Sequence, residues 1–266
     1  MSSLNKFVAL VTGGSKGIGA AIVKDLAKKG AIVYFCARES KEFTNLIKES
    51  LKNNYQVIGI IADVNKKEDI DNIYSTIKLN HGKLDILVNN VGGAIQYGSF
   101  FELDDETWTD VYNFNVLTTV RFVKGAYELL LKSNLKRIIN ISSIVGIQPG
   151  FFNPHYSITK SAIINLSKHL SKILAKDKIL VNVICPGSIH TEAWIDNVKA
   201  IQIKNNISYQ EAWENLEEEE IKKIPLGRVG EPEDISSAVI YLCSEGASWI
   251  TGSILNINGG KISTAI

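Results

Sequence analysis

Tyr156 and Lys160 stand four residues apart in the stretch HYSITKSA, residues 155–162. In a helix, side chains at this spacing lie one turn apart on the same face. A neighbouring cation favours the ionised phenol and lowers the tyrosine pKa from about 10 toward neutral pH. The pair therefore predicts a tyrosine that exchanges a proton with a substrate. The alternative is an ordinary amphipathic pair on a helix surface.

A glycine-rich stretch near the start of the chain is a second candidate site. In VTGGSKGIGA, residues 11–20, Gly13, Gly17 and Gly19 follow an apolar run and precede a helical pattern. Glycines allow a tight turn and close approach of a pyrophosphate, which the free N–H groups of a helix N-terminus can bind. The stretch predicts a dinucleotide-binding turn, and the alternative is a tight turn without a ligand.

The residues after the second apolar run indicate which dinucleotide would bind. Ala37 stands where such sites usually carry an acidic residue for the ribose 2′-hydroxyl. Arg38 follows it, and Lys16 adds a cation from the glycine-rich turn. Two cations without an acid suit a 2′-phosphate, so NADP(H) is favoured over NAD(H). Two alternatives remain: the cations could be solvated surface residues, and Glu39 could hold the ribose of NAD.

The elements that must position these residues follow from short apolar runs separated by segments of helical period, such as 18–29. The runs are nearly continuous in hydrophobicity, as in buried parallel strands, and cover 7–12, 31–37, 56–62, 84–90, 137–142, 179–185 and 253–258. This alternation predicts an α/β fold, a doubly wound (Rossmann) parallel seven-stranded sheet with helices on both faces, in a single domain spanning 1–266. The stretch 192–226 lacks a strand and predicts a lid over the site or a surface excursion.

Composition limits the partners of the chain. The net charge of +1 argues against nucleic acid, and no run approaches the roughly 18 apolar residues of a membrane span. The three cysteines have no C-x-x-C spacing and predict buried thiols in a reducing compartment, and the four histidines show no metal-ligand spacing. We therefore expect a soluble cytoplasmic protein without a metal. The acidic run 217–220 predicts a solvated helix face.

Further motifs follow in a fixed order, and with them the sequence resembles the short-chain dehydrogenase/reductase family over nearly its whole length, including its 3-oxoacyl-reductase and tropinone-reductase-like members. The motifs are the glycine-rich turn, Asp63-Val64, NNVG (89–92), NFNV with Asn115, Ser143 with Tyr156 and Lys160, and Pro186-Gly187. The resemblance implies an NADPH-dependent carbonyl reductase that also works as a secondary-alcohol dehydrogenase. The alternatives are an NAD-dependent dehydrogenase of a sugar, steroid or similar alcohol and, in another class, a cofactor-binding regulator without catalysis.

The resemblance also implies roles for single residues. The catalytic tetrad would be Asn115, Ser143, Tyr156 and Lys160. In it the tyrosine donates a proton to the substrate oxygen, the serine binds that oxygen, and the asparagine holds water that supplies protons through the lysine. Ser142 competes with Ser143, and the family spacing of serine and tyrosine selects Ser143. The residues implied to bind the cofactor are Gly13, Ser15, Lys16, Gly17, Ile18, Gly19, Arg38, Asp63, Val64, Asn90, Gly92, Tyr156, Lys160, Pro186, Gly187, Ile189 and Thr191.

The sequence does not identify the small-molecule carbonyl or alcohol substrate. Its candidate determinants are the segments 93–97, 148–154 and 192–226. Four side chains within them could line an apolar pocket or serve as core plugs: Phe151, Phe152, Trp194 and Ile195. His155 is expected in a loop or interface, and His190 at the substrate or the surface. The resemblance further implies a homotetramer built on long helices near 104–131 and 155–177.

Overall fold

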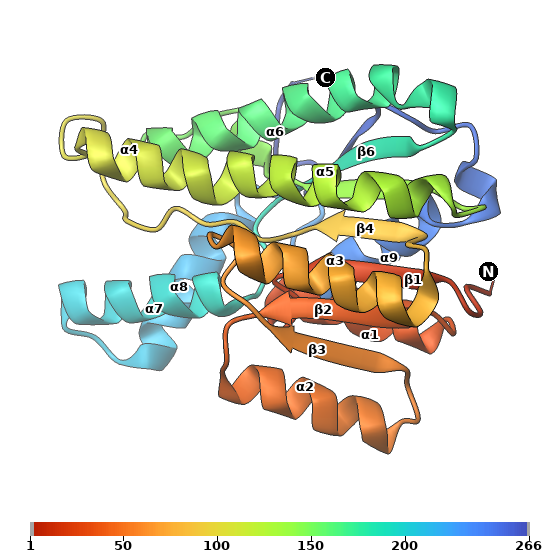
Figure 1. Ribbon diagram of the computed structural model, residues 1–266. Coiled ribbons are helices and arrows are strands. Elements are labelled where there is room, and N and C mark those ends of the chain that lie inside the picture. The colour runs from red at the N-terminus through yellow and green to blue at the C-terminus, as the bar shows by residue number, and fades with distance from the viewer. Residues whose placement is uncertain (1–2, 265–266) are drawn as a thin grey trace.

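The computed structural model describes residues 3–264, and its centre is a parallel sheet of seven strands in the order β3-β2-β1-β4-β5-β6-β7 (Figure 1). The strands are β1 (Val8–Thr12), β2 (Ile32–Ala37), β3 (Val57–Ile61), β4 (Ile86–Asn89), β5 (Arg137–Ile141), β6 (Leu180–Pro186) and β7 (Ile254–Ile257). Each predicted apolar run corresponds to one strand, and β6 extends one residue beyond its run, to Pro186. The predicted doubly wound sheet in a single domain is therefore confirmed.

Helices cover both faces of the sheet because its strands are apolar on both sides. Ala9 and Val11 of β1 face one core cluster, whereas Val8 and Leu10 face the other, as the alternation of side chains along a strand requires. The first cluster takes in α1 (Gly17–Lys28), α2 (Lys41–Lys52) and α9 (Pro232–Leu242). The second takes in α3 (Lys67–His81), α5 (Thr118–Leu131) and α6 (Pro154–Ile173).

The strand order reverses between β1 and β4, and this is where the site residues gather. The chain leaves β1 toward β2 and β3 and then returns to place β4 on the other side of β1. Ligands of such sheets bind outside the carboxyl ends of the strands at this switch point. The hydroxyl of Thr12 accepts hydrogen bonds from the N–H groups of Asn90 and Val91, at 2.9 and 3.0 Å, and so joins the two strand ends.

The predicted helical region near 104–131 is not a single regular helix. α4 (Asp105–Tyr112) passes into a π-helical turn, Asn113–Leu117, before α5 begins. Such π-turns are rare and occur frequently at functional sites. This one carries Asn115, whose side chain is fully buried.

The stretch 192–226 forms two helices, α7 (Glu192–Asn205) and α8 (Tyr209–Ile221), which lie beyond the carboxyl ends of the strands (Figure 1). They share a small core of their own with residues after α8, made of Trp194, Val198, Ala212, Ile224 and Val229. The helices therefore pack mainly on each other rather than on the sheet.

The structure decides between the alternatives for the loop aromatics and corrects the prediction for the acidic run. Trp194 is only 5% exposed and belongs to the core of the helix pair, whereas Phe151 is 99% exposed and Phe152 is also exposed, so the three do not line one pocket. The acidic run is not a uniformly solvated face. Glu220 bonds Lys261, Lys223 and the hydroxyl of Ser188, which together lower the pKa of Glu220 to about 2 although its partial burial acts to raise it.

The three cysteines are buried and free, as predicted. Within residues 3–264, no helix is long and apolar enough to cross a membrane. The same residues contain no cluster of histidine, cysteine and carboxylate side chains that could hold a metal ion.

Candidate active site

The glycine-rich turn has the shape that a phosphate group needs. A Cβ atom on Gly19 would lie 2.1 Å from the carbonyl oxygen of Gly13, and one on Gly14 would lie 2.5 Å from Phe35, so both positions require glycine. Within the described chain, Lys16 at the N-cap makes no side-chain capping bond, and the first turn of α1 has no acidic residue. The N–H groups and the positive end of this helix are thus available to a pyrophosphate.

The predicted 2′-phosphate corner lies at the end of β2. Ala37 ends the strand, and Arg38, Glu39 and Lys16 are all exposed. Glu42, in the first turn of α2, was not foreseen at this corner. The pKa of Glu42 is lowered first by its own backbone N–H, next by Ser40, and further by the charge of Lys16. Lys16 therefore lies close to α2 as well as to the turn.

The residues expected near adenosine lie at the neighbouring strand ends. Asp63 follows β3, accepts a hydrogen bond from the N–H of Asn65 at 3.0 Å and donates its own N–H to Asp69 at 2.7 Å. Val64 is buried. The side-chain amide of Asn90 donates to the carbonyls of Thr12 and Gly13 at 3.0 and 3.1 Å, so it fixes the glycine-rich turn.

Three of the four predicted catalytic residues form a cluster beside the end of β5, in which Lys160 is buried and Ser143 and Tyr156 are partly exposed. Lys160 is 3% exposed, donates to the carbonyl of Ile141 at 3.0 Å, and has its Nζ atom 5.5 Å from the centre of the Tyr156 ring. Ser143 lies close enough to the Tyr156 phenol to lower its pKa, and its hydroxyl accepts a hydrogen bond from the N–H of Val145 at 3.3 Å. Ser142 instead donates to the carbonyl of Lys160 at 2.7 Å, away from the phenol. The choice of Ser143 over Ser142 as the catalytic serine stays a prediction.

The electrostatics of this cluster differ from the sequence prediction. Burial raises the pKa of Tyr156 to about 12, although the hydrogen bond of Ser143 acts to lower it. Burial also lowers the pKa of Lys160 to about 8. The expected lowering of the tyrosine pKa by its neighbouring cation is therefore wrong for the polypeptide itself. The physical reason is that desolvation penalises the charged forms of both groups.

Asn115 is joined to this cluster through a loop and a helix. Its side-chain amide donates to the carbonyl of Gly93 at 3.0 Å and to the hydroxyl of Thr159 at 2.8 Å, and its Oδ1 accepts from the N–H of Gly93 at 2.9 Å. A Cβ atom on Gly92 would lie 2.9 Å from both this oxygen and Nζ of Lys160. The side chain therefore fixes the loop after β4 to α6. No pattern in the sequence indicates this contact of Thr159.

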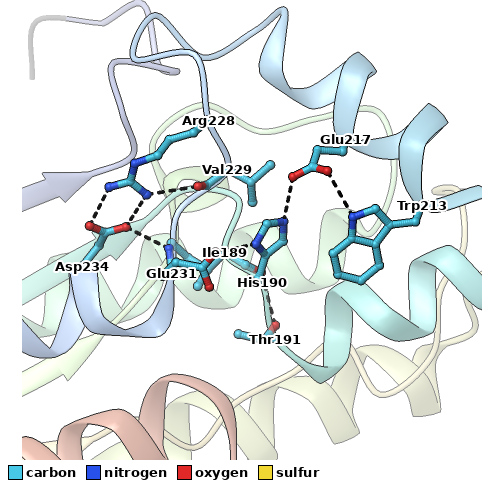
Figure 2. A network of polar contacts seen from close by, with 9 residues as sticks. All are labelled: Ile189, His190, Thr191, Trp213, Glu217, Arg228, Val229, Glu231 and Asp234. Atoms are coloured by element: carbon cyan, nitrogen blue, oxygen red, sulfur yellow. Dashed lines mark hydrogen bonds and ion pairs between the residues drawn. The ribbon is translucent and has the colours of Figure 1, made fainter. Parts of the chain in front are cut away.

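The segment after β6 is held by β7 and by the chain before α9. Pro186 ends β6, the N–H of Gly187 donates to the carbonyl of Ile257 at 2.9 Å, and Ile189 pairs with Gly230 as an isolated bridge. Figure 2 shows His190 between two carboxylates, with Nδ1 2.7 Å from Glu231 and Nε2 3.4 Å from Glu217. The contact of Nε2 with Glu217 is within ion-pair range, but its geometry is not that of a hydrogen bond. His190 is thus engaged by protein groups and ties the segment to α8.

A cavity of about 320 Å³ opens between the glycine-rich turn and the helix pair. It is lined by Gly17, Thr191, Glu192, Ile195 and Trp213, among others. The Oε2 atom of Glu192 lies 3.0 Å from where a Cβ atom of Gly17 would stand. A carboxylate beside the phosphate turn was not foreseen. Its place directly after Thr191 in the sequence is the one signal that could have suggested it.

The family model for short chain dehydrogenases matches residues 7–202. The chain belongs to this family. It is therefore an oxidoreductase that acts on CH–OH and C=O groups, with NAD(P) as the cofactor expected of the family. The predicted resemblance is confirmed.

Several relatives of this short-chain dehydrogenase match it almost from end to end. A 3-oxoacyl-(acyl-carrier-protein) reductase of Haemophilus influenzae is 34% identical over 95% of this chain and 97% of its own length. A tropinone reductase homolog of Arabidopsis thaliana is 36% identical over 97% of this chain and 76% of its own. L-sorbose reductase of Gluconobacter frateurii, solved with NADPH and L-sorbose, superposes with a TM-score of 0.91 at 31% identity and covers 98% of both chains.

Proposed function

We propose that this short-chain dehydrogenase is an NADPH-dependent carbonyl reductase, reversible as a secondary-alcohol dehydrogenase. The observation that carries the proposal is the cluster of Ser143, Tyr156 and the buried Lys160 at the strand ends that also hold the phosphate turn. Burial of a cation is costly, and a protein that only binds the cofactor would gain nothing from a lysine buried beside a tyrosine. The related L-sorbose reductase was solved in complex with NADPH, which supports the proposal.

The roles of the side chains follow from their surroundings. The bound nicotinamide would supply a hydride to the carbonyl carbon or accept one from the alcohol carbon. Tyr156, whose pKa is about 12, is protonated at neutral pH and can donate its proton as negative charge builds on the carbonyl oxygen. Ser143 lies beside the phenol and can bind the same oxygen. Lys160, whose pKa is about 8, exchanges protons readily near neutral pH and can restore the proton of the phenol.

The choice of NADPH rests on the corner at the end of β2. Arg38 and Lys16 are both exposed there, and Ala37 offers no carboxylate to repel a 2′-phosphate. A charge-assisted hydrogen bond contributes about 1.5–3 kcal/mol, which is roughly tenfold to a hundredfold in affinity. NADPH is therefore expected to bind at least about tenfold more tightly than NADH. Added salt should reduce this difference because the corner is exposed.

Titration of both cofactors against the wild-type protein tests the choice. In the double variant Ala37→Asp/Arg38→Gln the preference should reverse, because the new carboxylate repels a phosphate and accepts the ribose hydroxyl. Lys41→Gln, an exposed cation at the start of α2, is the matched control and should leave the preference unchanged. Equal or tighter binding of NADH by the wild type would contradict the proposal and favour the alternative, in which Glu39 holds the ribose of NAD.

Turnover itself is tested with a panel of ketones. Oxidation of NADPH should be followed with 3-oxoacyl esters, bicyclic amino ketones and ketoses, the substrate types that the names of the relatives suggest. Reduction of at least one ketone, lost in Tyr156→Phe, would support a carbonyl reductase. If no ketone is reduced and no secondary alcohol is oxidised while the cofactor still binds, the regulator without catalysis becomes the better description.

Three further parts of the proposal concern the whole molecule. The segment 192–226 acts as a lid, supported by the separate core of α7 and α8 and by their place at the cavity beside Gly17.

The protein forms a homotetramer through the region of α4, α5 and α6, supported by the exposed apolar side chains of Tyr112, Ile158 and Ile173. It works in the cytoplasm, supported by its three buried free thiols.

A further inference from the structure

The loop after β4 contains a strained turn next to the catalytic tyrosine. The N–H of Gln96 donates to the carbonyl of Ala94 at 2.7 Å, which closes a three-residue γ-turn around Ile95. Ile95 has φ of 61° and is the one β-branched residue with positive φ between residues 3 and 264. A γ-turn with positive φ is rare and strained, and a β-branched side chain makes it more so. Such a conformation persists where the surroundings hold it, and it is concentrated at functional sites.

His155 is the group that holds this turn. Its side chain is completely buried, and its Nε2 atom lies 3.0 Å from each of the carbonyl oxygens of Ala94 and Gln96, on either side of Ile95. Carbonyl oxygens only accept hydrogen bonds, so Nε2 carries the proton and donates it to both. The ring packs edge-on against Trp108, with 5.9 Å between centroids. The expectation that His155 is a loop or interface residue is therefore wrong.

Two more contacts fix the same loop to the catalytic helix and the π-turn. Gly98 exchanges a pair of hydrogen bonds with Asn153, at 2.9 and 3.1 Å, directly before α6. Gly93 is held at the other end by Asn115. Between these anchors the side chains of Ile95 and Tyr97 remain 58% and 63% exposed. The phenol of Tyr97 lies close enough to Tyr156 to contribute to its raised pKa.

We propose that His155 is a positioning residue for catalysis. By holding the carbonyls around Ile95, it keeps the strained turn in place. The turn in turn positions the side chains of Ile95 and Tyr97 as a wall that contacts the substituents of the substrate ketone. This inference rests on the proposed reductase activity. An aliphatic and an aromatic side chain form this wall, so it favours substrates with an apolar substituent beside the carbonyl over polyhydroxylated ketones. Neither Ile95 nor Tyr97 is among the residues predicted to bind the cofactor.

The test compares His155→Leu with His155→Gln, which retains a side-chain N–H donor, and with His169→Leu, which removes an exposed histidine of the same helix. His155→Leu should raise the KM for the ketone about tenfold, the effect of one lost hydrogen bond, and leave the affinity for NADPH unchanged. The Gln96 and Gly98 amides should exchange hydrogen faster. His155→Gln should recover part of both effects, and His169→Leu should show neither.

A second substitution separates positioning from general damage to the fold. Glycine adopts positive φ without strain, so Ile95→Gly should restore slow amide exchange at Gln96 in the His155→Leu background. It should not restore the KM, because the aliphatic wall is still missing. An unchanged KM and unchanged exchange in His155→Leu would overturn the proposal, as would continued fast exchange in the double variant. If the wild type reduces no ketone, the proposed function fails, while the exchange measurements still decide whether His155 holds the turn.

Discussion

Replacing Lys160 by methionine should make the cofactor-free protein more stable at neutral pH. The Nζ atom is buried and has one hydrogen-bond partner in the described part of the chain, the carbonyl of Ile141, with no carboxylate in ion-pair range. Burial lowers the pKa of Lys160 from 10.5 to about 8. At roughly 1.36 kcal/mol per pH unit, holding the proton on the buried amine at pH 7 costs about 3 kcal/mol.

Methionine fills a similar volume without a charge, but it leaves the Ile141 carbonyl without this donor. A lost hydrogen bond of this kind costs about 1 kcal/mol, so the expected net gain in the free energy of unfolding is about 2 kcal/mol at pH 7. Between pH 8 and 10.5 the unfolded wild-type chain keeps the proton that the folded chain has released, so the wild type gains stability as pH rises. The advantage of Lys160→Met should therefore be complete below pH 8 and close to zero near pH 10.

Urea unfolding of the wild type, Lys160→Met and Lys172→Met at pH 7 and pH 10 measures the effect. Lys172 is exposed on the same helix, and its replacement should change stability little at either pH. Lys160→Met should also lack ketone reduction. The reasoning fails if Lys160→Met is no more stable than the wild type at pH 7. It also fails if a gain at pH 7 persists unchanged at pH 10, because the charge would then not be its cause.

Tyr156→Phe should abolish turnover, measured as NADPH oxidation, while a fluorescence titration still shows cofactor binding; more than about a tenth of wild-type activity would remove the phenol from the acid role. Glu192→Gln should tighten NADPH and NADH by the same factor, up to about tenfold, because it removes a carboxylate beside the phosphate turn that both cofactors share; a change in the ratio of the two affinities would contradict this. In hydrogen exchange, 192–226 should be less protected than the sheet without ligand and gain protection with NADPH and ketone, whereas equal protection in both states would indicate a static insertion. Within that segment the end of α8 should exchange least, because Glu220 anchors it.

The sequence was enough to predict the sheet and the site motifs because both depend on local patterns. Continuous apolar runs mark buried parallel strands wherever they occur, and each of the seven became a strand. Spacing placed Tyr156 and Lys160 on one helical turn, and the missing Cβ atoms of Gly13 and Gly19 already implied a close approach of strand and helix. These properties are set by residues that are neighbours in the chain.

The tertiary structure alone decided how charges and strain are distributed. Desolvation depends on which distant segments cover a group, so no local pattern could show that burial raises the pKa of Tyr156 and lowers that of Lys160. The acidic run predicted a solvated Glu220, whereas in the fold its carboxylate contacts Ser188 and Lys261. His155 became a support for a turn 59 residues away because two carbonyls of that turn face its buried ring. In each case the deciding partner is remote in sequence, and only packing brings it within the few ångströms over which hydrogen bonds and desolvation act.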